Sequence, residues 1–321
     1  MIRYMGKRLL GMIPVLIGVT FIIFTMMHFT PGDPARIILG DMATDKDIEL
    51  FNETNGLNKP FLTQYLNYLV KIVTKGDLGT SYVTKQPVSK EIIARFPTTF
   101  WLAFMSIIFA SIFGVLIGVI SAVKPYSLFD TIVTPLSLIG IATPTFWLGM
   151  MLIILFSVNL KWLPPSGFKT VAHWVLPTIA LGVNAAARIM RITRSSMLEV
   201  IRQDYVRTAR AKGTKEVVVV LKHALRNSFI PIVTVIGLSF GRQLGGAVLT
   251  ETIFSIPGLG KLMVDAIKVK NFPMVQGGVL FIAFIMIMVN IIIDLIYAFV
   301  DPRIKSQYTK AAKKISTEGE E

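Results

Sequence analysis

The stretch "DYVRTARAKGTKEVVVVLKHALRN", residues 204–227, is a basic block between two apolar segments. Its second half carries apolar residues at i, i+3 and i+4 spacing, which predicts an amphipathic helix leading into the next apolar segment. Residues 199–212 contain no Pro or Gly and are rich in Ala and Arg, which favour helix. Gly213 follows, as a left-handed residue at a helix C-terminus would. We therefore predict a helix–turn–helix hairpin.

This hairpin has two interpretations, a solvated loop or a segment that docks on a partner. Small residues that permit close backbone approach are Thr208, Ala209 and Ala211. Residue types that are enriched at protein interfaces are Tyr205, Arg207 and Arg210. The combination favours docking into a groove on another protein.

The composition of the whole chain is that of a polytopic membrane protein. Of its 321 residues, 53% are hydrophobic and only 16% are charged, and the mean hydropathy is +0.64. Cysteine is absent, which excludes disulfides, thiolate nucleophiles and Cys-based zinc sites. The net charge of +14 fits either nucleic-acid binding or the Lys and Arg excess of cytoplasmic loops, so the topology has to be established first.

Runs of about 20 apolar residues are long enough to cross a bilayer. Six such runs occur, over residues 9–29, 98–123, 131–158, 173–187, 228–250 and 275–300. The first resembles a signal peptide, but it is too long and lacks a small-x-small cleavage site, so we expect an uncleaved helix. The fold class predicted is an all-α membrane protein with six transmembrane helices.

The distribution of basic residues orients these helices. With the N-terminus inside, the inner segments hold 19 Lys and Arg, against five in the short outer loops. We predict an N-in, C-in chain in which the excess charge faces anionic lipid or an acidic cytoplasmic partner. The predicted parts are a first segment and helix at 1–29, an external loop at 30–97, a core at 98–301 with an inner loop at 199–226, and a cytoplasmic tail at 302–321.

Several chemical functions are disfavoured. No aromatic-interleaved basic platform is present, so we expect no nucleic-acid partner. The segment "SIPGLGKL", residues 255–262, resembles a phosphate-binding loop, but Ser255 replaces the first glycine and Leu262 replaces the Mg-binding hydroxyl. The three histidines are dispersed, and no catalytic set stands out. We expect no catalytic residue, metal or cofactor in this chain.

Two charged residues lie within apolar runs and are costly in hydrocarbon. Arg242 either lines a water-filled path, snorkels outward or pairs with Glu251. Gly237, Gly241 and Gly245 recur along the same run, either to let helices pack or to clear a passage. Together with Arg242, these glycines form the candidate translocation path. Asp294 is expected to pair with a basic residue of the inner loop.

The chain resembles, end to end, the B-type inner-membrane permease subunits of ABC importers of the dipeptide, oligopeptide and nickel class. The motifs that carry the resemblance are "FTPGDPA", "GDLGTSY" with "QPV", "ATPTFWLG", "LPPSG", "SMLEVIRQDYVRTARAKG", "ETIFSIPGLGKL" and "DLIYAFVDPRIK". The resemblance implies the type I ABC importer fold. It also implies that the hairpin is the EAA loop, whose first helix fits a groove on an ATPase subunit.

Within the EAA pattern, Gly213 takes the glycine position and Ala209 the second alanine. Arg207 and Thr208 stand where the pattern has Glu and the first Ala, and Asp204 is the candidate for the acidic contact. The resemblance thus assigns ATPase coupling to Asp204, Tyr205, Arg207, Thr208, Ala209, Arg210, Lys212 and Gly213.

The resemblance further implies a subunit of a bacterial or archaeal cytoplasmic membrane. It would form a heterodimeric path with a second permease. Two ATPase subunits would hold the ATP and Mg, and an external binding protein would deliver a dipeptide or oligopeptide. Alternatives are a permease of the same class for nickel or another solute, and, in a different class, an ion-coupled secondary transporter. A membrane enzyme is a third alternative, without a catalytic set to support it.

Overall fold

The computed structural model describes residues 2–40 and 42–300. Within these residues every regular element is a helix, and the pairing between Thr80 and Pro87 is an isolated bridge. The predicted tail at 302–321 lies outside the described residues. An all-helical chain agrees with the predicted fold class.

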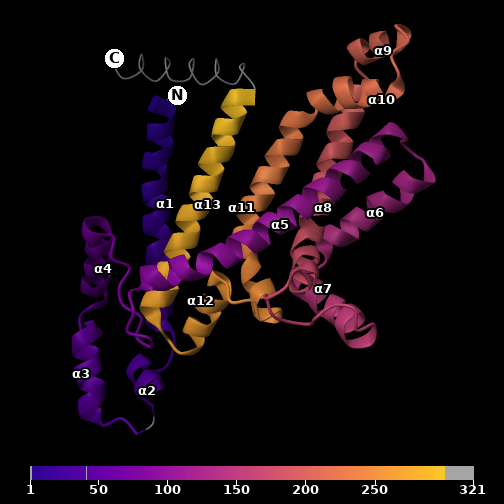
Figure 1. Ribbon diagram of the computed structural model, residues 1–321. Coiled ribbons are helices and arrows are strands. Elements are labelled where there is room, and N and C mark those ends of the chain that lie inside the picture. The colour runs from indigo at the N-terminus through magenta and orange to yellow at the C-terminus, as the bar shows by residue number, and fades with distance from the viewer. Residues whose placement is uncertain (1, 41, 301–321) are drawn as a thin grey trace, which may run out of the picture.

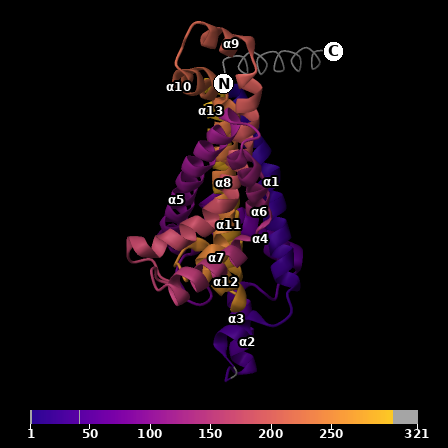
Figure 2. The same ribbon diagram turned by 90° about the vertical axis from the view of Figure 1, so that its right-hand side faces the viewer.

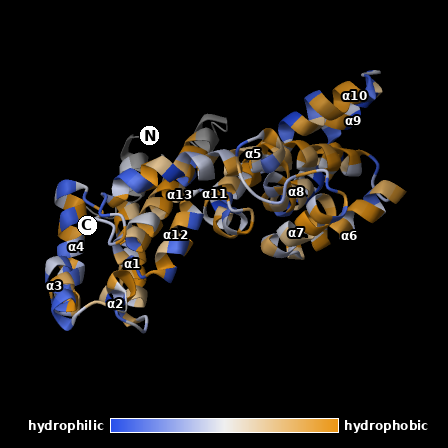
Figure 3. Ribbon diagram, turned by 60° about the horizontal axis from the view of Figure 1, so that its bottom comes forward, coloured by the Kyte–Doolittle hydropathy of each residue, from blue (hydrophilic) through white to orange (hydrophobic). Residues whose placement is uncertain are grey.

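Five helices of the described part are long and apolar enough to cross a membrane. They are α1 (Ile2–Phe29), α5 (Val88–Val123), α8 (Val171–Ile201), α11 (Phe229–Ile253) and α13 (Phe272–Val300). Two shorter segments, α6 (Leu128–Ala142) and α7 (Thr145–Leu152) with its π-helical extension (Ile153–Asn159), count as a sixth span only if they are taken together. Hydrophobic residues dominate the long helices and α6 and α7 (Figure 3).

The predicted third span, over 131–158, is not one continuous helix. The chain bends by 105° between α6 and α7. Pro144 cannot donate a backbone hydrogen bond, and it forces Thr143 into an extended conformation with φ −69° and ψ 122°. The helix therefore ends at Ala142 and restarts in a new direction after the proline.

Two other predicted boundaries are also wrong. The fourth span does not end near residue 187, because α8 continues through Arg188, Arg191 and Arg194 to Ile201. Arginine ends an apolar run, but it favours helix, and no Gly or Pro occurs between Arg188 and Ile201. Similarly, α5 begins ten residues before the apolar run that predicted it, at Val88.

The packing of α5 against α8 forms the centre of the molecule. A Cβ atom on Gly114 would lie 2.7 Å from the carbonyl oxygen of Ala186, and one on Gly118 would lie 2.7 Å from that of Met190. Only glycine permits so close an approach of two backbones. Gly114 and Gly118 therefore allow the backbones of α5 and α8 to pack closely.

Different segments of the chain lie at the two ends of the molecule. The start of α1, the end of α13 and the hairpin helix α9 (Asp204–Ala211) lie at one end, and α2 (Pro34–Leu39) and α3 (Asp45–Asn55) lie at the other (Figures 1 and 2). This arrangement is the one that an N-in, C-in chain with an external loop requires.

The segment between α1 and α5 forms a compact structure on the outer end. Helix α4 (Phe61–Lys75) packs on the outer half of α1 through aromatic contacts, and the hydroxyl of Tyr65 donates to the carbonyl of Ile17 at 3.1 Å. The side chain of Asn271, just before α13, accepts from the backbone N–H of Tyr82 at 2.9 Å and donates to Ser81 at 2.8 Å. The loop is thus fastened to both the first and the last long helix.

Candidate functional site

The predicted hairpin is present, with one boundary corrected. The first helix does not run over 199–212. Instead, α8 ends at Ile201, Gln203 is extended at φ −73° and ψ 149°, and α9 covers Asp204–Ala211. Gly213 has a φ of +78°, in the left-handed region that favours glycine, so the predicted turn position is confirmed. The second arm consists of α10 (Glu216–Val218) and a π-helical turn, Val219–Leu225.

Helix α9 has one buried face and one exposed face. Val206 and Ala209 are buried against Val219 of the second arm, with Val200 at the edge of the cluster. Ala209 therefore helps to close the hairpin on itself, and its predicted role in coupling stays a prediction. The exposed predicted coupling residues are Asp204, Tyr205, Arg207, Thr208, Arg210, Lys212 and Gly213. Tyr205, at 45% exposure, presents a large aromatic surface to solvent.

An ion pair across the turn holds the two arms together. The guanidinium of Arg210 donates to both carboxylate oxygens of Glu216, at 2.6 and 3.1 Å. This hydrogen bonding lowers the pKa of Glu216 and raises that of Arg210. In the structure the side chain of Arg210 braces the hairpin, and its predicted role in coupling stays a prediction. A weaker pair, Arg207 with Asp204 at 3.8 Å, lies on the exposed face.

Below the hairpin, a second ion pair joins three helices. Asp130 at the start of α6 is 4% exposed and accepts from Arg194 of α8 at 2.6 and 2.8 Å. Ser121 of α5 also donates to the same carboxylate, as does the backbone N–H of Tyr126 at 2.9 Å. This cluster therefore ties α8 to α5 and α6 directly below the hairpin. Sequence reasoning missed this cluster, because its members lie 64 and 73 residues apart.

In the middle of the helical core, two arginines lie on adjacent helices. Arg242 of α11 is exposed and donates to Ser239 at 3.2 Å. Helix α11 packs against α8 at this level, because Val235, Ile236 and Phe240 contact the buried cluster that contains Ala185 and Ile189. Arg188 in turn donates through Nε to Asn184 at 2.9 Å. We call these two residues the arginine pair. The predicted alternative of an Arg242–Glu251 pair is wrong, because Glu251 bonds elsewhere.

The glycines of α11 contact α13. A Cβ on Gly237 would lie 2.7 Å from Ile293, and Cβ atoms on Gly241 and Gly245 would lie 3.7 Å from Val289 and Met286. This placement favours helix packing, and a role in the path stays a prediction for them. Asp294, on α13, is half-buried, and its predicted pairing with the inner loop also stays a prediction.

Glu251 occupies the loop that resembles a phosphate-binding site. Its fully buried carboxylate accepts from Thr99 at 2.5 Å and from the backbone N–H of Lys261 at 2.9 Å, in the first turn of α12 (Leu259–Lys268). A Cβ on Gly258 would lie 2.3 Å from this carboxylate. The glycines of "SIPGLGKL" therefore make room for an internal anion at a helix N-terminus.

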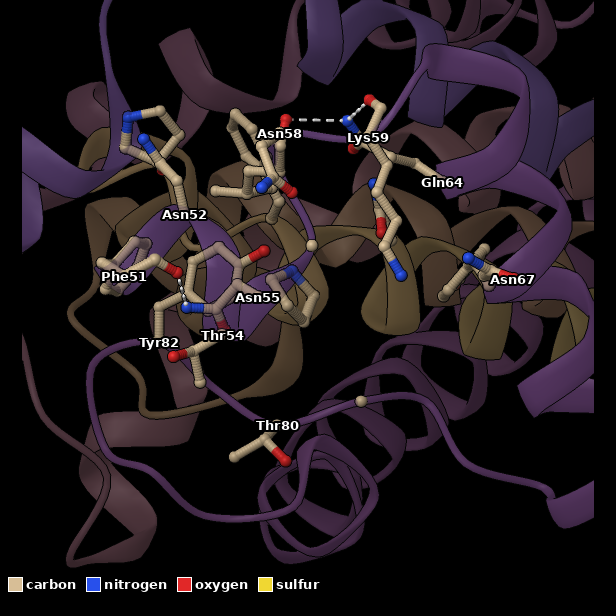
Figure 4. A pocket seen from close by; sticks show the side chains of 18 of the residues that line it. Phe51, Asn52, Thr54, Asn55, Asn58, Lys59, Gln64, Asn67, Thr80 and Tyr82 are labelled. Atoms are coloured by element: carbon tan, nitrogen blue, oxygen red, sulfur yellow. Dashed lines mark hydrogen bonds between the residues drawn. The ribbon is translucent and has the colours of Figure 1, made fainter. Parts of the chain in front are cut away.

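At the outer end, a cavity of about 1210 Å³ lies between α3, α4 and the segment before α5. Amide and hydroxyl side chains line much of it, and Figure 4 shows Asn52, Asn55, Asn58, Asn67 and Thr80 around the opening. The side-chain amides of Asn55 and Gln64 donate hydrogen bonds to backbone carbonyls of the same loop. Across the described residues, no group of three or more His, Asp or Glu is placed to hold a metal ion.

The architecture and the hairpin define a membrane component of a transport system. The chain matches the family "binding-protein-dependent transport system inner membrane component" over residues 114–306 and the corresponding N-terminal region over residues 1–103. It therefore belongs to this family of ABC importer permeases, in its peptide and nickel class, and is an inner-membrane protein.

Relatives match over nearly their whole length. The chain is 45% identical over 305 residues to the glutathione transport system permease protein GsiC of Pectobacterium atrosepticum, covering 95% of this chain and 99% of that one. The identity is 44% to the Salmonella typhimurium protein and 43% to that of Escherichia coli K12, with the same coverage.

Solved structures support the fold. The inward-facing MetNI methionine ABC transporter aligns with a TM-score of 0.54 at 19% identity, covering 65% of this chain and 96% of that one. An amino acid ABC transporter crystallised with histidines aligns with a TM-score of 0.52 at 13% identity, covering 65% and 93%. These likenesses confirm the type I permease fold.

Proposed function

We propose that this permease forms, with a second permease, the path of an ATP-driven importer of short peptides, including tripeptides of the size of glutathione. An external binding protein delivers the peptide, and two separate ATPase subunits hydrolyse ATP. The observation that carries the proposal is α9, whose exposed face projects from the end of the molecule on two internally braced arms. The names of the relatives support a peptide-like solute.

The hairpin can drive the path only if its contacts with the ATPases differ between two states. Its internal packing makes it a rigid unit, because Val206 and Ala209 are buried and Arg210 is paired with Glu216. The Asp130–Arg194 pair then connects α8 to α6 directly below. Closure of the ATPases is thereby converted into a movement of the transmembrane helices.

The arginine pair also indicates the charge of the solute that the path accepts. Two neighbouring positive charges repel a bare divalent cation and attract an anion. The nickel alternative is therefore less consistent with this core than a peptide that carries carboxylates. Membership of the ABC importer permease family argues against the ion-coupled transporter that the sequence left as an alternative. Such a transporter would show uptake that survives the loss of ATP hydrolysis and collapses with the ion gradient.

The docking role of α9 is tested with charge introduced on its exposed face. Thr208→Glu places a charge at the proposed contact without disturbing the buried Val206 and Ala209. We expect ATP-dependent uptake in the assembled transporter to fall at least about tenfold, because an unpaired charge is costly in an interface. The control Val217→Glu adds the same charge to an exposed position of the second arm.

The measurement is uptake of radiolabelled tripeptide together with membrane abundance of the permease. Loss of uptake in T208E but not V217E, at equal abundance, supports docking through α9. Full uptake in T208E would show that α9 is not the contact. Equal loss in both variants would assign the contact to the hairpin as a whole.

A further inference from the structure

The elbow between α6 and α7 leaves carbonyl groups without helical partners. Because Pro144 stops the helix, the carbonyls of Gly140 and Ile141 are free to accept from elsewhere. The side-chain amide of Asn184, on α8, donates to Ile141 at 2.7 Å and to Gly140 at 3.4 Å. These bonds fix the orientation of Asn184 and leave its oxygen facing along α8.

That oxygen positions Arg188 one turn further along the helix. It accepts from Nε of Arg188 at 2.9 Å, which aligns the guanidinium and leaves its two terminal nitrogens available. No hydrogen bond or ion pair among the described residues occupies those nitrogens. Arg188 is thus held in place with its strongest donors unused.

Arg242, on α11, is the second arginine of the pair. It lies thirteen residues into a helix of 25, near the middle of the span, and one of its nitrogens contacts Ser239. Arg242 and Arg188 lie on helices that pack against each other on both sides of this level, through Ile189 with Val235 and Ile236 and through Leu181 with Gly246. Neither arginine forms an ion pair with a carboxylate of the described residues. Two like charges placed together without an acid are unfavourable unless an anion binds between them.

The guanidinium of Arg242 cannot simply face lipid. An exposed guanidinium in hydrocarbon is costly, so charged residues at this depth face a water-filled path or a partner. The exposed face of α11 around Arg242 includes Leu238 and Leu249, which gives the surroundings of the charge an apolar character. A guanidinium beside apolar surface binds a carboxylate through two parallel hydrogen bonds, more strongly than in bulk water.

We propose that Arg188 and Arg242 form a carboxylate-binding subsite of the transmembrane path, which takes the C-terminal carboxylate of the imported peptide. Asn184 is its positioning residue. This inference rests on the proposed function and adds a requirement, since the solute must carry an anionic group. The chain's lack of cysteine makes it directly testable, because an introduced thiol is the only one in this subunit.

The first experiment uses the assembled transporter in proteoliposomes, with its binding protein and ATP. Uptake of S-methylglutathione is compared with uptake of its C-terminal amide. We expect R188Q and R242Q each to slow uptake of the acid by about ten- to a hundredfold, since each removes a charge-assisted hydrogen bond. Uptake of the amide should change little, and R242K should recover part of the rate for the acid.

The second experiment labels single cysteines with a membrane-impermeant maleimide. We expect R242C to be labelled and S-methylglutathione to protect it under turnover, whereas the lipid-facing control I22C is neither labelled nor protected. Failure of R242C to react, or reaction without protection, would overturn the subsite, and so would equal slowing of acid and amide in the glutamine variants. Absence of any ATP-dependent peptide uptake in the wild type would instead overturn the proposed function.

Discussion

Glu251 illustrates which residue contacts a sequence can and cannot indicate. An ion pair with Arg242 was one of the alternatives for that arginine, but burial places the carboxylate of Glu251 against Thr99, 152 residues away. The loop "SIPGLGKL" is predicted not to be a nucleotide site because it lacks the Mg-binding hydroxyl, and this stays a prediction. What its glycines do instead depends on Val248 and Glu251, which approach it only after folding.

At Gly260 we predict that a methyl group is not tolerated. A Cβ there would lie 2.5 Å from the backbone of Val248, which cannot move aside, so Gly260→Ala should destabilise the protein by about 2 kcal/mol. Gly246→Ala, on the neighbouring helix, meets its nearest atom at 4.0 Å and should be neutral or slightly stabilising. Thermal unfolding of the two purified variants in detergent checks this, and equal midpoints would contradict it.

Among the elements, the spans were located correctly but their ends and shapes were not. Hydropathy does not reveal the bend at Pro144, because the helices on both sides of it are apolar. It also does not reveal that α8 extends past Arg188, because a helix can continue where an apolar run stops. In the hairpin, Gly213 could be predicted from its residue type, since a left-handed turn selects glycine. The inward direction of Ala209 could not, because it depends on Val219 across the turn.

The contact of α6 with α8 depends on the Asp130–Arg194 pair, and we predict that Asp130→Asn weakens it. The substitution leaves Arg194, only 24% exposed, without its carboxylate, at a cost of about 3 kcal/mol. The control Asp265→Asn removes a half-exposed carboxylate paired with Lys261 and should cost less than about 1 kcal/mol. The measured quantity is the unfolding midpoint, and a similar loss in both variants would be inconsistent with the buried pair.

For the whole molecule, the basic-residue count predicted an orientation that the arrangement of the ends supports. Both the start of α1 and the hairpin lie opposite the outer cavity, as alternate placement of inner and outer loops demands (Figure 1). The mutual packing of α1 with α13, and of the outer loop with both, was not predictable. Such pairings join segments that no local pattern relates.

We predict that the two ends label from opposite sides of the membrane. Thr54→Cys on α3 should react with an impermeant maleimide in cells whose outer barrier is opened but whose cytoplasmic membrane is intact. Lys215→Cys in the hairpin should react only after that membrane is permeabilised. Both positions are exposed, and the native chain offers no competing thiol. Labelling of both from the outside would refute the N-in, C-in topology.

The anchoring of the outer loop by Asn271 imposes an order on biosynthesis. Tyr82 leaves the ribosome 189 residues before its partner, which at about 5–20 residues per second means a delay of roughly 10–40 s. During that interval the first helix and the loop must persist without α13. The contacts of the newly made outer loop are thus complete only when the last long helix arrives.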